Sequence, residues 1–128
     1  MTASDPVMPT LVATVLQSPE PIALARFYGA LTGWTVHEDG PTWLRVRPDS
    51  GPGLSVQFEP AYVAPTWPGT EDAPGMQLHL DFQVEDLAGA VARAEELGAR
   101  QAEYQPQEDV RVLLDPDGHP FCLFLPGA

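Results

Sequence analysis

The feature that most constrains the fold of this chain is a strand-then-helix pattern that occurs twice. In the second copy, polar and apolar residues alternate from His79 to Val84, as in a strand whose two faces meet different surroundings. From Leu87 to Leu97, apolar residues recur every three or four positions, which predicts a helix with one buried face. Asp86 stands where an N-cap is expected, and Gly98 where the helix should end. The polar face of the strand is therefore expected to point away from the core.

The first copy begins with an apolar, β-branched strand at residues 10–16. Ser18 is predicted to cap the helix that follows, and Pro21 suits the first turn of that helix. Three further strands are predicted after each helix, at residues 34–38, 42–47 and 54–59 in the first copy and 100–104, 110–114 and 121–125 in the second.

Equivalent positions in the two copies lie at nearly equal spacings. From Ala13 to Gln57 is 44 residues, and from His79 to Cys122 is 43. An internal repeat of this kind decides the architecture of the whole chain. We expect an α+β fold of two βαβββ modules that form an open mixed sheet around a concave cavity.

The 128 residues suffice for one compact domain. Module 1 is predicted at about 10–60, a proline-rich connector at 61–75, and module 2 at about 76–126. The connector has no clear period, so it is either a linker or a functional loop. Its Tyr62 and Trp67 either cover a pocket or pack against the surface.

The charge balance excludes one class of partner. Eighteen acidic residues against six basic ones give a net charge of −12, which repels phosphate backbones, so nucleic-acid binding is not expected. A cationic ligand would be attracted, although the charge also serves solubility alone. The chain has no lysine, which excludes Schiff-base chemistry by a side-chain amine.

Other sequence features bear on the compartment. Cys122 is the only cysteine, so no intrachain disulfide forms. The N-terminus lacks the basic and apolar segments of a secretory signal. No apolar stretch approaches the ~20 residues that span a membrane. A cytoplasmic protein without membrane contact is expected.

Several short segments together resemble a known superfamily. They are Ala23–Tyr28, Leu31–Trp34, His79–Asp81, Val84–Leu87, Leu97–Ala99 and Asp115–Phe121. Over about residues 10–126 the chain resembles the vicinal oxygen chelate superfamily, which includes glyoxalase I, bleomycin-resistance proteins, fosfomycin-resistance enzymes and extradiol dioxygenases. More closely, it resembles the small actinobacterial glyoxalase-like proteins of this superfamily. The resemblance implies a homodimer.

The resemblance also implies four metal positions, on the first and fourth strands of each module. They fall on Ala13, Gln57, His79 and Cys122. Ala13 cannot coordinate, Gln57 is a weak neutral donor, and Cys122 is a soft donor where relatives usually have glutamate. Because catalytic sites favour three ligands rich in histidine and carboxylate, we expect no cofactor. A divalent metal on His79 and Gln57 is the alternative.

Acidic and amide residues share the strand faces of these positions. Asp81 and Glu59 are the candidate catalytic acid and base, and Gln83 is a candidate ligand contact. The alternative is that Asp81 and Glu59 are both solvated groups on an open sheet face.

The third predicted strand places Trp43, Arg45 and Arg47 on one face. Facing inward, the arginines would hold a carboxylate or phosphate of a ligand; facing outward, they only solubilise the sheet. Trp43 and Phe124 are candidates for aromatic walls or for core. His37 and His119 are weaker candidates for the site. His119 follows the Asp115–Gly118 turn and is expected to be exposed, and His37 lies on an early strand near Glu38.

These observations favour a protein that binds a small cationic or aromatic molecule in the concavity, without a catalytic metal. The candidate ligand-binding residues are Trp43, Arg45, Gln57, His79, Asp81, Gln83, Cys122 and Phe124. A second hypothesis is a divalent-metal-dependent lyase, isomerase or dioxygenase that uses His79. A third is a metal-free biosynthetic enzyme with Asp81 or Glu59 as the acid or base.

Overall fold

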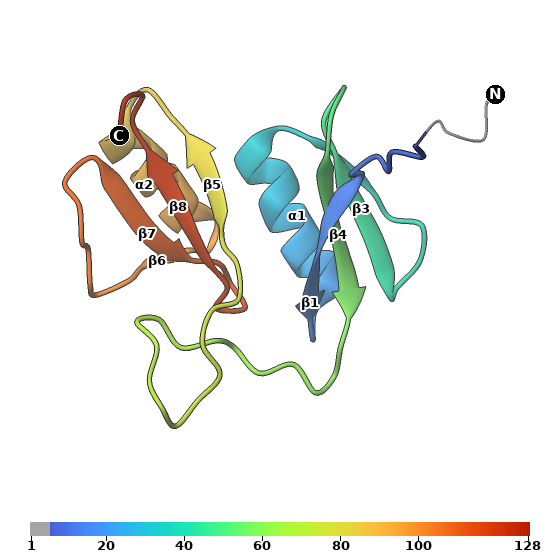
Figure 1. The fold of residues 1–128 in the computed structure, drawn as a ribbon, viewed down its shortest axis with the longest axis horizontal. Coiled ribbons are helices and arrows are strands. Elements are labelled where there is room, and N and C mark those ends of the chain that lie inside the picture. The colour runs from blue at the N-terminus through green and yellow to red at the C-terminus, as the bar shows by residue number, and fades with distance from the viewer. Residues whose placement is uncertain (1–5) are drawn as a thin grey trace.

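The computed structural model describes residues 6–128, which contain eight strands and two helices (Figure 1). The first half comprises β1 (Ala13–Ser18), α1 (Pro21–Thr32), β2 (Thr35–His37), β3 (Trp43–Arg47) and β4 (Gly53–Phe58). The second half comprises β5 (Leu80–Gln83), α2 (Leu87–Leu97), β6 (Arg100–Gln101), β7 (Val110–Leu114) and β8 (Pro120–Phe124). The order βαβββ thus occurs twice, which confirms the predicted α+β fold.

Each module forms its own four-stranded mixed sheet. The strand orders are β1-β4-β3-β2 and β5-β8-β7-β6, so the two sheets have the same topology. In each sheet the first and fourth strands of the module pair in parallel, and the remaining pairs are antiparallel. Parallel pairing requires a crossover, which the rest of the module supplies. Figure 1 shows the two modules side by side, joined below by the connector.

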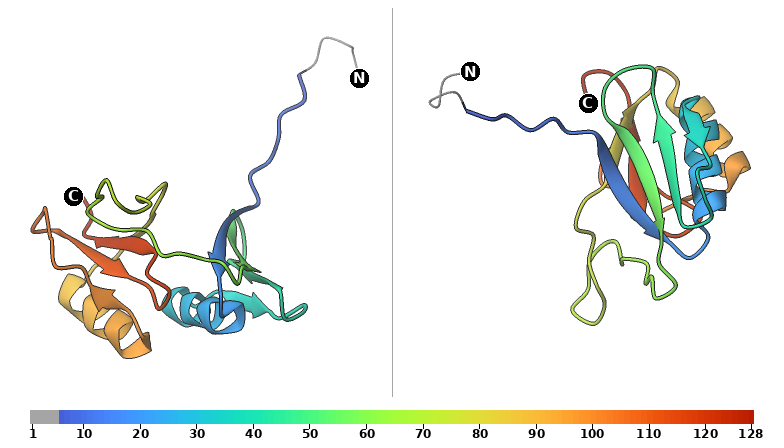
Figure 2. Two further views of the ribbon diagram at one scale, coloured as in Figure 1. Left: turned by 90° about the horizontal axis from the view of Figure 1, so that it is seen from below. Right: turned by 90° about the vertical axis from the view of Figure 1, so that its right-hand side faces the viewer.

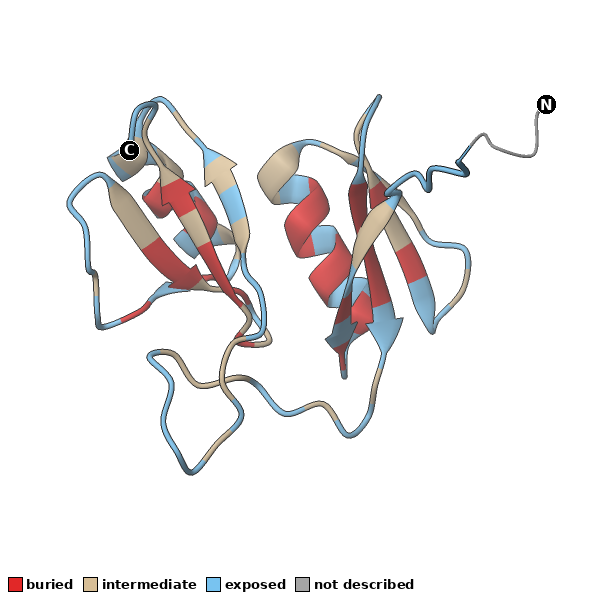
Figure 3. Cartoon of the chain, in the orientation of Figure 1, coloured by how far each residue is buried: buried red, intermediate tan, exposed pale blue. Residues whose placement is uncertain are grey.

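Both helices lie on the same side of the two sheets (Figure 2). The guanidinium of Arg93 on α2 donates to the carbonyl of Leu31 on α1 at 3.1 Å. The strand faces that turn toward the helices form one buried core with them (Figure 3). Aromatic rings from both modules meet in this core. The ring centroid of Tyr28 on α1 lies 6.2 Å from that of Phe121 on β8 and 6.4 Å from that of Phe82 on β5. Such aromatic pairs add to the free energy gained by burial.

The opposite strand faces remain open, as the alternation predicts. On β3, Leu44 and Val46 are fully buried, whereas Trp43 is 41% exposed. On β5, Asp81 and Gln83 are exposed. Among residues 6–128, neither helix combines the length and apolarity needed to cross a bilayer.

The helix caps were predicted correctly for α2 and only partly for α1. The Asp86 carboxylate accepts from the Gly89 N–H at 3.0 Å, and Gly98 ends α2 with a φ of 118°. Pro21 opens α1, but the N-cap residue is Glu20, which makes no side-chain cap hydrogen bond. The prediction of Ser18 as the cap was wrong, because Ser18 is the buried last residue of β1 and its hydroxyl donates to Asp117.

The strand expected at 100–104 is shortened to β6, Arg100–Gln101. The side chain of Gln105 replaces the missing strand pairs. Its amide nitrogen donates to the carbonyls of Ala102 and Val112 at 2.9 and 2.8 Å, and its amide oxygen accepts from the Val112 N–H at 2.8 Å. A side chain therefore satisfies backbone groups that a longer β6 would have paired.

Candidate functional site

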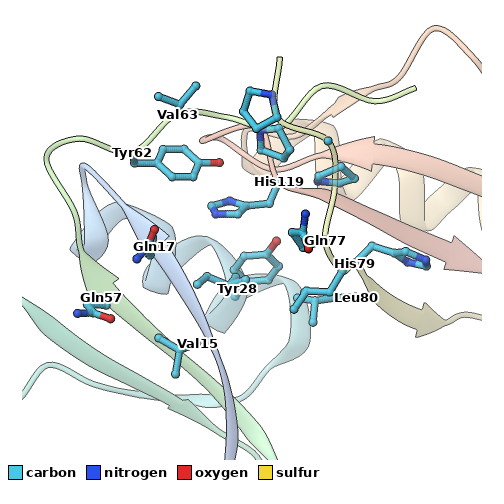
Figure 4. Close-up of a pocket in the computed structure, with 16 residues that line it drawn as sticks. Val15, Gln17, Tyr28, Gln57, Tyr62, Val63, Gln77, His79, Leu80 and His119 are labelled. Carbon is cyan, nitrogen blue, oxygen red and sulfur yellow. The ribbon is translucent and has the colours of Figure 1, made fainter. Parts of the chain in front are cut away.

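The main pocket lies where the two modules and the connector meet (Figure 4). Its volume is about 450 Å³. Module 1 contributes Val15 and Gln17 from β1 and Gln57 from β4, and the connector contributes Tyr62. The approach to β5 contributes His79. Most of the lining is apolar, and within residues 6–128 the lining includes no carboxylate.

His119 belongs to this pocket, and the expectation that it is exposed was wrong. Its side chain is only 14% exposed. Its ring stacks on Tyr62, with ring centroids 4.9 Å apart and planes at 27°. The connector therefore covers the turn that precedes β8. No sequence pattern predicts this contact, because a turn motif does not show what packs over it.

The His119 ring is held by Asp115, which is fully buried at the end of β7. The Nδ1 of His119 lies 2.8 Å from one carboxylate oxygen of Asp115. The same carboxylate accepts from the Tyr28 hydroxyl at 2.7 Å and from the Asp117 N–H at 2.9 Å. Because Tyr28 belongs to α1, this buried carboxylate connects the two modules.

The environment of Asp115 keeps the nearby tyrosines protonated. Burial raises the pKa of Tyr28 well above its usual value, and the negative charge of Asp115 raises it further. Burial and the charges of Asp115 and Asp117 also raise the pKa of Tyr62. Tyr62 donates its hydroxyl proton to the Asp117 carbonyl at 3.1 Å. Both phenols therefore act as hydrogen-bond donors within the protein.

A second group of polar side chains lies on the open face of the second sheet. Asp81 and Cys122 are register partners on β5 and β8, and His79 precedes β5. The His79 Nδ1 lies 2.8 Å from Asp81 Oδ1 and 3.9 Å from Cys122 Sγ. One ligand atom from each residue lies within 4.8 Å of the other two. This group of residues could hold a metal ion.

The Cys122 thiol is protonated at neutral pH in this setting. Burial raises the pKa of Cys122 to about 11, with smaller contributions from the charge and hydrogen bond of Asp81. A thiol with this pKa is a poor nucleophile. A metal ion would therefore have to displace the proton before it binds the sulfur.

The other predicted site residues are dispersed. Phe124 lines a hollow together with the His79, Asp81 and Cys122 group, whereas Gln83 lies in another hollow beside Arg93. Their part in ligand binding stays a prediction.

The first-module residues of the predicted site lie outside the pocket, except for Gln57. Trp43 is opposite Gln57 in register but does not line the pocket. Arg45 is ion-paired with Asp39 at 2.7 Å on the surface, and Arg47 donates to Ser55 Oγ at 3.1 Å. Glu59 accepts from the Ala61 N–H at 3.1 Å. Each of these three charged side chains is therefore already paired with a group close to it in the chain.

The glyoxalase-like domain family matches residues 13–124, and the chain belongs to this family. The match agrees with the wider superfamily predicted from the sequence, while the similarity to actinobacterial proteins in particular stays a prediction. No curated protein was found to match the chain.

Solved structures share the fold at low sequence identity. A glyoxalase/bleomycin resistance protein/dioxygenase family enzyme from Burkholderia phytofirmans PsJN gives a TM-score of 0.68 at 18% identity, covering 91% of this chain and 98% of the other. Protein ATC0852 from Agrobacterium tumefaciens gives a TM-score of 0.68 at 22% identity, covering 92% of this chain and 98% of the other. Oxidase ChaP-H2 gives a TM-score of 0.64 at 19% identity, covering 93% of this chain and 94% of the other. These similarities establish the fold and leave the activity open.

Proposed function

We propose that this protein binds a small organic molecule in the pocket between its two modules. The observation that carries the proposal is a pocket of about 450 Å³ built by both modules and the connector. Ligand sites are typically concave, largely apolar and supplied with a few convergent polar groups. Here the polar groups include Gln57 and His79, two residues proposed from the sequence.

The lining favours an uncharged, partly aromatic ligand over a cationic one. Val15, Val63 and Leu80 present apolar surface, and Tyr62 presents an aromatic ring. The net charge of −12 would attract a cation. However, no carboxylate lines the pocket within the described residues, so the pocket itself lacks the partner that a buried cation requires.

A thermal-shift screen of neutral aromatic and cationic compounds tests this proposal. We expect neutral aromatic compounds to raise the melting temperature, because a ligand that binds only the folded state stabilises it. Replacing Gln57 by alanine should weaken binding about two- to tenfold if a hydrogen bond is lost. The matched variant Gln101→Ala changes an exposed residue outside this pocket and should bind normally. Equal affinities of the two variants would argue against Gln57 as a contact.

A second candidate function is that of a divalent-metal enzyme, and the group of His79, Asp81 and Cys122 favours it. Their nitrogen, oxygen and sulfur donors match those of zinc, and three protein ligands leave an open coordination position. The metal positions implied by the resemblance fit less well, because Ala13 has no donor and Gln57 is absent from this group. A bound divalent ion would supply Lewis-acid chemistry to a lyase, isomerase or dioxygenase.

Metal analysis by mass spectrometry separates the two candidates. The protein is equilibrated with zinc, manganese, nickel or iron, and is then dialysed. About one retained ion per chain, lost in both His79→Ala and Asp81→Ala, would favour the metal enzyme. The absence of retained metal under all four conditions would remove this candidate.

The third hypothesis, a metal-free enzyme with Asp81 or Glu59 as acid or base, stays a prediction. Neither carboxylate lines the main pocket. The expected homodimer, the cytoplasmic location and the module boundaries also stay predictions.

A further inference from the structure

The His119 ring lies in the pocket wall, and Asp115 holds its orientation through hydrogen bonds. Its backbone N–H donates to Asp115 Oδ1 at 3.0 Å, and its Nδ1 lies 2.8 Å from the other oxygen of the same carboxylate. An ionised carboxylate can only accept hydrogen bonds. When the ring is neutral, its single proton therefore lies on Nδ1, and Nε2 is a bare acceptor.

The Nε2 atom of His119 has no hydrogen-bond partner. Across residues 6–128 it is the sole buried side-chain nitrogen or oxygen in this condition. Buried polar atoms are normally satisfied, so each exception calls for an explanation such as a missing ligand or water. The ring also lines the main pocket, and Figure 4 shows it between Tyr62 and Tyr28.

The neighbouring tyrosines cannot take this role. The Tyr28 hydroxyl already donates to Asp115, and the Tyr62 hydroxyl donates to the Asp117 carbonyl. The pKa values of both phenols are raised, so neither ionises to become an acceptor of the same strength near neutral pH. Of this trio, His119 is thus the residue with a buried side-chain polar atom that has no hydrogen-bond partner.

We propose that His119, positioned by Asp115, accepts a hydrogen bond from an O–H or N–H group of the pocket's ligand. This inference rests on the proposed binding function and narrows its ligand class to apolar or aromatic molecules that carry such a donor, such as phenols. Because Nε2 is buried, a ligand reaches it only when the side chains around it shift. No acid or base chemistry is required for this role.

Phenol and anisole make a matched pair of probes for the full-length chain. They have similar shape and apolar surface, but only phenol has an O–H donor. One net hydrogen bond corresponds to a preference of up to about tenfold. We therefore expect the wild-type protein to bind phenol about tenfold more tightly than anisole in a titration followed by two-dimensional NMR.

The variant His119→Phe keeps an aromatic ring for stacking on Tyr62 and removes both nitrogens. In this variant we expect the preference for phenol over anisole to disappear while anisole still binds. The control His37→Ala removes a histidine on β2 that does not line the pocket, and should retain the wild-type preference. Two-dimensional NMR spectra report whether each variant is folded.

A measurement on the wild-type protein keeps the proposal falsifiable if His119→Phe does not fold. Imidazole ¹⁵N spectra should show His119 protonated at Nδ1 and bare at Nε2, and phenol but not anisole should shift the Nε2 signal. The opposite tautomer, or equal binding of both probes at pocket residues, would overturn the role of His119 while leaving the pocket as a binding site. Failure of both probes to perturb any pocket residue would overturn this proposal and count against the binding function as well.

Discussion

At the scale of single residues, Asp115 is the most consequential side chain. It is fully buried and receives hydrogen bonds from a tyrosine of the other module, from the backbone of its own turn and from the His119 ring. Removing one partner of a buried charged group costs more than a typical hydrogen bond contributes, because the remaining group loses its solvation without compensation. Variants of its partners should therefore lower the stability.

The variant Tyr28→Phe tests this directly. It deletes only the hydroxyl that donates to Asp115 at 2.7 Å, so we expect the free energy of unfolding to fall by about 1–3 kcal/mol. Urea denaturation measures the change. The matched control Tyr104→Phe removes an exposed hydroxyl and should change stability by less than about 0.5 kcal/mol. Equal effects of the two variants would refute the importance of the Asp115 contact.

Asp117 predicts a pH dependence of stability. Burial raises the pKa of Asp117, and the neighbouring Asp115 raises it further, while the Ser18 hydrogen bond lowers it. With a raised folded-state pKa, the folded protein holds the proton more tightly than the unfolded chain. The free energy of unfolding therefore falls as the pH rises from the pKa of Asp117 in the unfolded chain, about 3.9, through its higher pKa in the folded protein.

Replacing Asp117 by asparagine removes this contribution. We expect the stability of Asp117→Asn relative to wild type to increase with pH above about 4, measured by urea denaturation at a series of pH values. Asp49→Asn, at an exposed position, serves as the control. A difference between Asp117→Asn and wild type that stays constant with pH would contradict the raised pKa.

At the scale of elements, periodicity predicted most of the fold, and side-chain contacts account for the exceptions. The spacing of apolar residues and the pair Asp86 and Gly98 correctly predicted α2. Ser18 was misread as a cap because its role depends on Asp117, 99 residues away in the chain. The strand at 100–104 was overextended because an amide side chain, Gln105, takes over its backbone pairing. Local sequence patterns do not predict a contact between residues so far apart in the chain, nor a side chain that replaces a backbone partner.

Gln105 therefore has an element-scale role that can be measured. In Gln105→Ala the Val112 N–H and the Ala102 carbonyl lose their partner, whereas the Val112 carbonyl still accepts from the Ala102 N–H. We expect a loss of about 1–3 kcal/mol in the free energy of unfolding. Hydrogen exchange should show faster exchange of the Val112 N–H. Gln107→Ala, in the same loop, is the matched control. Unchanged exchange at Val112 would show that the side chain does not replace the strand.

At the scale of the whole molecule, the site arises from the packing of two similar modules. The repeat predicted two modules and a cavity, but the pocket also depends on how the connector lies over the turn after β7. His79 and Gln57 were predicted and do line the pocket, whereas Trp43 and Arg45 lie outside it. His119 was missed because its place depends on Tyr62, which a proline-rich stretch without periodicity does not reveal.

The most direct test of the binding site is to fill it. Val15 lies on β1, is 44% exposed and lines the pocket, so tryptophan at this position should occupy the cavity without disturbing the core. Val7→Trp adds the same side chain in the exposed N-terminal segment and is the matched control. For the best compound of the thermal-shift screen, calorimetric titration should show no measurable binding to Val15→Trp and normal binding to Val7→Trp, with both variants folded. Undiminished binding to Val15→Trp would contradict the account, because the ligand would then occupy another part of the molecule.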